Sequence, residues 1–220
     1  MKIIGHRGAR GLAPENTLAS LSKSLEHKVD EIEIDVRVTK DNVPVLHHDK
    51  TLQVADGPKL EIKSHTLKEL INFKKDLITL AEAIEYVDRK VPLYIEIKPS
   101  ENTSSIAKII KHYLLKGWST SNFLIGSKKQ KTLLAIHNLL PEIEKIVIEP
   151  WSGVRANRRA KQVGAKRLSM NRLWLWSGFI YSVSKGGKEL YAYTLNDPKK
   201  AKKWQKYGLK GVVTDYPDLF

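Results

Sequence analysis

Short apolar runs rich in β-branched residues alternate with longer amphipathic runs along almost the whole chain. The short runs predict nine strands, at residues 2–5, 31–38, 43–47, 93–97, 123–127, 145–148, 167–171, 189–195 and 211–214. The amphipathic runs between most of them predict helices, at residues 16–28, 80–88, 103–116, 128–140, 154–163 and 198–207. Repetition of strand and helix is typical of a parallel sheet covered by helices, which places the chain in the α/β class.

One pair of predicted strands differs from the others because its connection is short. Only residues 39–42 separate Val38 from Val43, whereas a parallel crossover needs at least about ten residues. The strand at about 43–47 must therefore form an antiparallel hairpin. The other eight strands have long connections, and eight parallel strands predict a compact (β/α)8, or TIM, barrel. An open doubly wound sheet is the alternative, but no Gly-x-Gly-x-x-Gly turn follows the first strand.

We expect the whole chain, residues 1–220, to form a single domain, because its length suits one domain and no linker or low-complexity tract divides it. The least regular part is a short excursion at about 52–64. Asn16 and Thr103 occupy positions where helix caps are expected, and Pro198 follows Asp197 as a first-turn proline would.

Composition narrows the cellular setting and the kinds of partner. The chain has no cysteine, so disulfides and thiolate metal sites are excluded. A strand-like run follows Met1-Lys2 directly, and no apolar run is long enough to span a membrane, so we expect a cytoplasmic protein. The net charge of +14 favours anionic partners, although a lysine-rich surface explains it equally well.

Charged side chains stand near the carboxyl ends of the predicted strands, where barrel enzymes keep their active sites. They are His6 and Arg7 after the first strand, Glu33 and Asp35 on the second, and Glu96 and Lys98 on the next barrel strand. Residues two apart on a strand share a face, so each pair can point into one site. Burial of three carboxylates without a cation would be costly. Three such oxygen ligands suit one divalent cation, Mg²⁺ or Ca²⁺, and suit Zn²⁺ less well.

Two histidines, His6 and His48, are candidates for proton transfer because imidazole titrates near neutrality. Strand alternation sends His47 and His48 to opposite faces, so only one of them can enter the site, and we assign His48. The remaining histidines lie away from acidic clusters and are interpreted as structural or solvated. Lys98 and Arg7 supply positive charge for an anion. The set as a whole suits metal-assisted cleavage of a phosphate ester.

These motifs together resemble the glycerophosphodiester phosphodiesterase family. The resemblance is carried by His6-Arg7-Gly8, Pro14-Glu15-Asn16-Thr17, Glu33-x-Asp35-Val36, Thr39-x-Asp41, His48-Asp49, Glu96-x-Lys98, Thr194-Leu195-Asn196 and Gly211-Val212-Val213-Thr214-Asp215-Tyr216-Pro217. They span nearly the whole chain in the family's order. The resemblance implies a barrel that cleaves a glycerophosphodiester, a small-molecule substrate, to glycerol 3-phosphate and an alcohol.

The resemblance also implies roles for single residues. Those matching Glu33, Asp35 and Glu96 bind the metal. Those matching His6 and His48 are the general acid and base. Those matching Arg7 and Lys98 contact phosphate.

The chain departs from the family's pattern at places that bear on the substrate. After His48-Asp49 the family often carries an Asp-Arg pair, whereas this chain reads Thr51-Leu52-Gln53-Val54. Its excursion is short, although larger insertions at this place shape the glycerol pocket of some members. Tyr193 stands where the family often has Trp, so we assign Tyr193 to the substrate-binding wall. The range of alcohols is left open.

Two other hypotheses are kept beside this one. The apolar patch Leu173-Trp174-Leu175-Trp176 begins at the catalytic end of a predicted strand, and an exposed Trp there would favour a lysophospholipase D-like activity with weak peripheral contact to a membrane. A non-catalytic basic protein on the same barrel is the other. The basic runs at 155–167 and 199–210 have only Trp204 and Tyr207 interleaved with them, so they are interpreted as solvated helices and no nucleic acid is expected.

Overall fold

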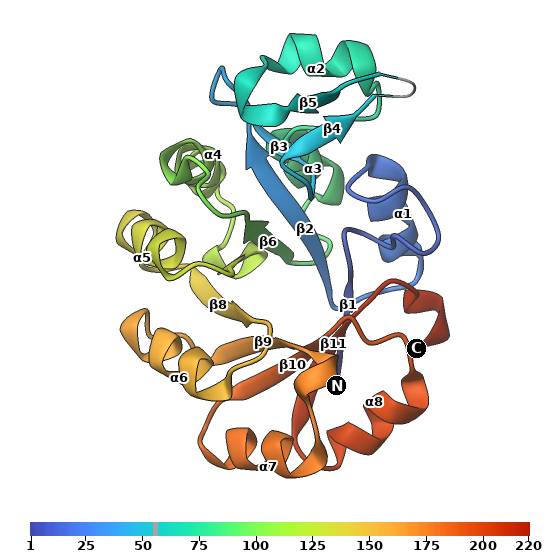
Figure 1. Ribbon diagram of the computed structural model, residues 1–220, viewed down its shortest axis with the longest axis vertical. Helices are drawn as coiled ribbons and strands as arrows, with labels where there is room; N and C mark the ends of the chain where they lie inside the picture. The colour runs from blue at the N-terminus through green and yellow to red at the C-terminus, as the bar shows by residue number, and fades with distance from the viewer. Residues whose placement is uncertain (55–56) are drawn as a thin grey trace.

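The computed structural model describes residues 1–54 and 57–220, and these residues form a closed barrel surrounded by helices (Figure 1). Eight parallel strands make the wall. In order around it they are β1 (Lys2–Gly5), β2 (Glu31–Val38), β6 (Leu93–Ile97), β7 (Phe123–Ser127), β8 (Glu144–Glu149), β9 (Arg167–Asn171), β10 (Glu189–Tyr193) and β11 (Leu209–Thr214). Because β1 pairs with both β11 and β2, the ring is closed. The predicted (β/α)8 barrel is confirmed.

Helices of the outer layer connect successive strands of the wall (Figure 1). They are α1 (Leu18–Glu26), α3 (Leu80–Val87), α4 (Thr103–Leu115), α5 (Gln130–Leu139), α6 (Gly153–Gln162), α7 (Ser177–Lys185) and α8 (Pro198–Gln205). Short 3₁₀ turns stand beside them at η2 (Thr120–Asn122), η3 (Arg172–Trp174) and η4 (Pro217–Leu219). Within the part of the chain that is described, no helix is both long and apolar enough to cross a membrane.

Two predicted helix caps are wrong by one residue. Thr17, not Asn16, caps α1, because its hydroxyl accepts from the backbone N–H of Ser20. Asn16 instead has a positive φ of 57° and turns its side chain toward the barrel. Asn102, not Thr103, caps α4. Pro198 does occupy the first turn of α8, as predicted.

The segment between β2 and β6 leaves the regular barrel pattern. β3 (Pro44–Leu46) pairs antiparallel with β2, which confirms the predicted hairpin. β4 (Thr51–Gln53) and β5 (Lys59–Glu61) form a separate two-stranded sheet that the sequence did not predict, followed by η1 (Ile62–Ser64) and α2 (Leu67–Phe73). These elements account for the predicted excursion at about 52–64, of which residues 55–56 lie outside the described residues.

Apolar side chains fill two layers of the barrel. Inside the wall, Ile4, Tyr94, Leu124, Ile146, Ile148, Tyr191 and Val213 pack against one another. Between wall and helices, larger clusters bury side chains such as Ile34, Leu93 and Phe123. Full burial of such a side chain stabilises the fold by roughly 1.5–3 kcal/mol. The wall is thus held rigidly from both sides, which is what a site at strand ends requires.

The amino-terminal end of the barrel is closed by a buried ion pair. Glu31 is fully buried, and its carboxylate lies 2.6 Å from Arg167 Nη1 and 2.7 Å from Lys2 Nζ. The guanidinium of Arg167 also lies over the ring of Tyr191, 4.5 Å from its centroid. Glu31 is therefore a structural group at the bottom of the wall.

Replacing Arg167 by Leu should destabilise the protein by about 3–5 kcal/mol, because the buried carboxylate of Glu31 loses its buried partner. Urea unfolding of the variant measures the loss. Lys2→Ala is the matched control: Lys2 is the half-exposed partner of the same carboxylate, so its removal should cost no more than about 1 kcal/mol. Equal losses in the two variants would contradict this account.

Candidate active site

The residues predicted to carry chemistry gather at the carboxyl-terminal end of the barrel strands, around a cavity of about 180 Å³. The side chains lining it are His6, Arg7, Arg10, Glu33, His48, Tyr94, Glu96, Lys128, Ile148, Ser169, Tyr193, Thr194 and Val213. Asp35 and Lys98 are buried behind this lining, where they contact each other. All the predicted site residues thus lie at this one place in the fold.

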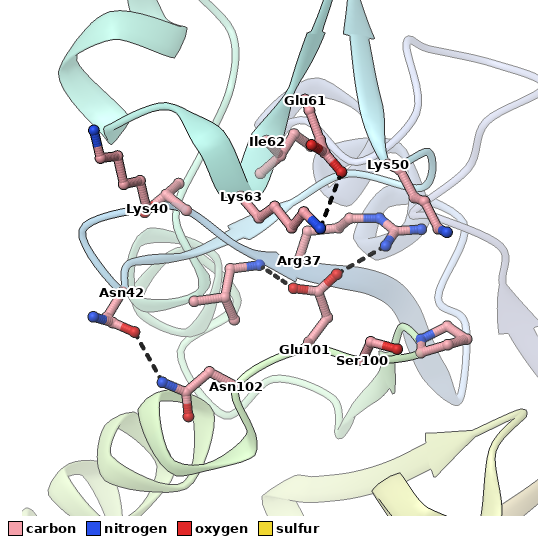
Figure 2. Close-up of a pocket in the computed structure, with 13 residues that line it drawn as sticks. Arg37, Lys40, Asn42, Lys50, Glu61, Ile62, Lys63, Ser100, Glu101 and Asn102 are labelled. Atoms are coloured by element: carbon pink, nitrogen blue, oxygen red, sulfur yellow. Dashed lines mark hydrogen bonds and ion pairs between the residues drawn. The ribbon is translucent and has the colours of Figure 1, made fainter.

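A larger cavity, of about 380 Å³, lies beside the excursion and contains none of the predicted site residues (Figure 2). Its wall is polar and includes Lys40, Lys50 and Asn102. Arg37 of β2 lines this larger cavity and also contacts the active-site loop, because its guanidinium donates to the backbone carbonyl of His48. Cavity size does not identify the site, because the grouped carboxylates and imidazoles lie in the smaller of these two cavities.

Three carboxylates form the acidic centre of the site. Glu33 and Asp35 lie two residues apart on β2, and the pairing of β2 with β6 sets Asp35 directly opposite Glu96. One oxygen from each lies within 4.8 Å of the others, and all three residues are buried. Carboxylate oxygens in such a group are ligands that Mg²⁺ and Ca²⁺ prefer. The donor set therefore fits the predicted divalent cation.

The protonation of these carboxylates differs because their neighbours differ. Burial raises the pKa of Glu33 well above its ordinary value, and the nearby charges of Asp35 and Glu96 raise it further. Burial also opposes ionisation of Asp35, but Lys98 and Arg7 outweigh it and hold the pKa of Asp35 below its ordinary value. Glu33 is thus the carboxylate most in need of an added positive charge.

Lys98 lies between two of the carboxylates. Its Nζ is 2.5 Å from Asp35 Oδ1 and 2.7 Å from Glu96 Oε1. Burial alone would lower the pKa of Lys98, but Glu96 and Asp35 outweigh burial and raise it. Lys98 therefore stays charged and holds the acidic group together, and the phosphate contact predicted for it stays a prediction.

Arg7 is held by groups from two segments, the loop before α1 and the strand β2. Its backbone N–H donates to Glu33 Oε2 at 2.9 Å, and its Nη1 donates to both carboxylate oxygens of Glu15 at 2.8 Å. Its Nε lies 3.1 Å from Asp35 Oδ2. Asn16 donates from Nδ2 to that same Asp35 oxygen and accepts from the Asp35 backbone N–H. Asn16 thus supports the site through Asp35. The sequence analysis missed this role because it predicted Asn16 to be a helix cap.

His6 is oriented by a carboxylate from the other end of the chain. Its Nδ1 lies 2.6 Å from Asp215 Oδ1 and 3.4 Å from the hydroxyl of Thr194. Asp215 is fixed in turn by Nδ2 of Asn196 at 3.0 Å and by Nε of Arg10 at 2.9 Å. Burial opposes ionisation of Asp215, but hydrogen bonds from His6 and Asn196 lower its pKa. The second ring nitrogen of His6 is left for proton exchange.

Asp215 was not assigned a role from the sequence. It directly follows β11, which is the same strand-end position that selected His6. It also belongs to the carboxyl-terminal motif that carried the family resemblance. The strand-end position of Asp215 could therefore be predicted from the sequence. Its pairing with His6 could not, because the two residues are 209 positions apart along the chain.

His48, rather than His47, lines the cavity, in agreement with the sequence prediction. Nδ1 of His48 lies 2.7 Å from Asp49 Oδ1. The ring of His47 turns to the backbone carbonyl of Thr51, at 3.2 Å. Burial lowers the pKa of His48, and the positive charges of Lys98 and Arg7 lower it further. A neutral His48 is therefore favoured near neutral pH.

The backbone of His48 is held by a buried arginine. Arg37 donates from Nη2 and Nε to the carbonyl oxygen of His48, at 2.8 and 3.1 Å. Figure 2 shows the other side of this arrangement, where Nη1 of Arg37 donates to Glu101 at 2.8 Å and the backbone N–H of Val38 donates to the same carboxylate. Arg37 thus fixes the loop that carries His48 to the rigid strand β2.

Tyr193 and Lys128 complete the wall of the cavity. The hydroxyl oxygen of Tyr193 is buried and makes no hydrogen bond within the described residues. Nζ of Lys128 lies 6.0 Å from the centre of the Tyr193 ring and 3.3 Å from Glu96. A polar group of a bound molecule would satisfy the Tyr193 hydroxyl. Lys128 is a further cation of the site, which the sequence analysis had assigned to a helix.

Comparisons with known proteins agree with this geometry. Residues 6–219 match the model of the glycerophosphoryl diester phosphodiesterase family. YhdW of Bacillus subtilis is 32% identical over an alignment covering 100% of this chain and 96% of that protein. The B. subtilis glycerophosphodiester phosphodiesterase is 26% identical, over 99% of this chain and 84% of its own length.

A solved structure is also closely similar. An Oleispira antarctica phosphodiesterase in complex with the product sn-glycerol-3-phosphate superimposes with a TM-score of 0.87. The two proteins are 28% identical, and the match covers 99% of this chain and 94% of that one.

The acidic group should bind a single Mg²⁺ or Ca²⁺ ion. Isothermal titration calorimetry of the chelator-treated protein measures it, and Glu96→Gln should weaken the affinity at least about tenfold, because one of three charged ligands is lost. Asp215→Asn is the control, since Asp215 is a carboxylate of the same site outside the acidic group. Wild-type affinity in Glu96→Gln would rule out the assignment of these ligands.

Proposed function

This chain belongs to the glycerophosphoryl diester phosphodiesterase family and is a phosphoric diester hydrolase, and we propose that it cleaves glycerophosphodiesters to sn-glycerol 3-phosphate and a free alcohol. One observation carries the proposal: His6 and His48 line the same small cavity as the buried acidic group. The product held by the similar Oleispira antarctica enzyme supports the choice of sn-glycerol 3-phosphate.

Glu33, Asp35 and Glu96 would hold the divalent cation. When bound, this ion supplies Lewis-acid polarisation of the phosphate, which is worth several kcal/mol of transition-state stabilisation. It would also supply the positive charge that the buried carboxylate of Glu33 needs. Lys98 keeps Asp35 and Glu96 in place through its two short contacts.

Hydrolysis breaks the bond between phosphorus and the oxygen of the leaving alcohol. One imidazole takes the proton from the attacking hydroxyl as its oxygen bonds to phosphorus, and the other gives a proton to the departing alcohol oxygen. Attack by water gives sn-glycerol 3-phosphate directly. Attack by a hydroxyl of the glycerol moiety gives a cyclic phosphate, which a water molecule then opens with the same two proton transfers. Each ring is suited to this task because Nδ1 is held by a carboxylate, Asp215 for His6 and Asp49 for His48. Such pairing fixes the orientation of the ring and leaves Nε2 facing the substrate.

The phosphoryl oxygens need donors. Arg7 lines the cavity and carries a guanidinium suited to two oxygens at once. Lys128 lines it as well, whereas Lys98 is buried behind it. We therefore assign Arg7 and Lys128 to direct phosphate contact and keep the contact of Lys98 as a prediction. The free hydroxyl of Tyr193 would donate to a polar group of the substrate.

Turnover of glycerophosphocholine, with release of sn-glycerol 3-phosphate detected by a coupled assay, tests the function directly. We expect turnover that a chelator abolishes and that Mg²⁺ or Ca²⁺ restores. Failure to release product with any of several divalent ions would contradict the proposed reaction on this substrate.

Replacing either His6 or His48 by Ala should lower kcat about a hundredfold or more, because general acid–base catalysis is lost. A substrate with a nitrophenol leaving group separates the two roles. Since nitrophenolate departs without a proton, the variant that lacks the general acid should recover much of its rate on this substrate. Equal defects of both variants on both substrates would contradict the division into one acid and one base.

Arg37 should act as a positioning residue for His48. Arg37→Gln should lower kcat about ten- to a hundredfold with little change in KM, because the His48 loop loses its anchor while the phosphate contacts stay. Arg37→Lys should recover part of the rate. Lys40→Gln, a change of equal charge in the wall of the same cavity, is the control and should leave kcat unchanged. An equal effect of the two Gln variants would mean that charge alone matters.

A lysophospholipase D-like activity is the second candidate, and one observation favours it. Trp174 and Trp176 are largely exposed and are not buried in the core, so both are free to contact an acyl chain. Comparison of kcat/KM for lysophosphatidylcholine and glycerophosphocholine decides between lipid and deacylated substrates. The non-catalytic hypothesis is set aside because the chain is a member of an enzyme family.

A further inference from the structure

Large apolar side chains are exposed on two neighbouring loops at the mouth of the barrel. Trp151 and Val154, after β8, are 56% and 86% exposed. Leu173, Trp174 and Trp176, after β9, are 73%, 58% and 65% exposed. We call these five residues the tryptophan surface. Monomeric proteins rarely leave so many large apolar groups together in water, so the surface indicates a binding partner.

The two loops lie against each other in the fold. β8 and β9 are paired neighbours in the wall, and α6 and α7 follow one another around the ring (Figure 1). Gly153 at the start of α6 lies so close to the ring of Phe179 in α7 that a side chain at this position would clash with it. The two segments that carry the tryptophan surface are therefore packed against each other.

The charge around this surface has one sign. Residues 150–188 contain nine Lys or Arg and no Asp or Glu. Arg158 on α6 and Arg172 after β9 are exposed and have no acidic partner within the described residues. A hollow of about 450 Å³ beside the loops is lined by Lys128, Lys129 and Arg158 among other basic groups. The partner must therefore be anionic as well as apolar.

The surface also has a fixed relation to the active site. It follows the carboxyl ends of β8 and β9, which is the end of the barrel that carries the acidic group. Lys128 lines both the catalytic cavity and the basic hollow. Whatever covers the tryptophan surface thus lies next to the entrance of the site.

We propose that the tryptophan surface and the basic hollow dock this enzyme on an anionic phospholipid bilayer, with the mouth of the barrel facing the lipid. Trp favours the region between headgroups and acyl chains, and the aliphatic Leu173 and Val154 gain from burial there. Lys129, Arg158 and Arg172 meet the negative headgroups. Docking would bring the active site to substrates that are themselves made from membrane lipids, and this last step rests on the proposed function.

Two other occupants fit less well. A second copy of this chain would bring two basic surfaces together, so like charges would oppose the contact. A single-stranded nucleic acid would use the tryptophans for stacking, but it would leave Leu173 and Val154 exposed to water. A bilayer covers the aromatic, the aliphatic and the basic groups at the same time.

Co-sedimentation with vesicles tests the docking. Wild-type protein should bind vesicles of phosphatidylcholine with roughly one third phosphatidylglycerol, bind pure phosphatidylcholine far more weakly, and dissociate as salt is raised. The double variant Trp174→Ser/Trp176→Ser should lose at least about tenfold in vesicle affinity. The matched control, Phe73→Ser/Leu115→Ser, removes two exposed apolar groups elsewhere on the surface and should bind like wild type.

The charge contribution has its own matched pair. Arg158→Glu/Arg172→Glu should weaken vesicle binding at least about tenfold, whereas Lys202→Glu/Lys203→Glu, the same change of charge on exposed residues of α8, should weaken it far less. Turnover of glycerophosphocholine should be unchanged in all four variants. That readout separates the docking from the catalytic proposal and confirms that each variant is folded.

Several results would overturn the proposal. Wild-type protein that fails to bind the anionic vesicles, or control variants that lose as much affinity as the test variants, would each do so. So would a wild-type dimer that the Trp variant dissociates, or a single-stranded oligonucleotide bound more tightly than vesicles through the same residues. Tryptophan emission of the wild type, which should shift to the blue and be quenched by brominated lipid, gives a second measurement that needs no variant.

Discussion

The parallel pairing of β2 with β6 is the constraint on which the rest of the site depends. It sets Asp35 opposite Glu96, with Glu33 two residues before, and it buries all three carboxylates. Buried negative charges are costly unless cations and donors surround them. Arg7, Lys98 and Asn16 meet that need, each through contact with Asp35. The loop between β1 and α1, which carries Arg7 and Asn16, is therefore held in place by the carboxylate of Asp35 on β2.

The two imidazoles show how a rigid wall positions groups on loops. His6 directly follows β1, and its partner Asp215 directly follows the neighbouring strand β11. His48 is held less directly, since Arg37 of β2 binds its backbone carbonyl and Asp49 its ring. One proton carrier is thus fixed by the wall, and the other by an arginine that reaches from the wall to a loop. This difference leaves His48 the more adjustable of the two.

Opposite ends of the same strands carry different kinds of charge. At the amino-terminal end, the single buried carboxylate of Glu31 is matched by two cations, Arg167 and Lys2. At the carboxyl-terminal end, three carboxylates lie against a cavity and share Lys98, Lys128 and Arg7, and Arg7 is also paired with a fourth carboxylate, that of Glu15. A fully compensated ion pair stabilises the fold, whereas a group short of positive charge is prepared for a cation.

The sequence by itself determined the barrel and the residue types at its mouth. Strand and helix periods are local properties, and alternation along β2 and around His47 and His48 correctly predicted which side chains face inward. Which of these groups meet depends on how the chain packs in three dimensions. The partnership of His6 with Asp215, the turn of Asn16 toward Asp35 and the anchor of Arg37 on His48 depend on strand register and loop packing. No local pattern encodes these contacts. Some of them join residues that are far apart along the chain. In the case of Asn16, a residue expected to cap a helix contacts the barrel instead.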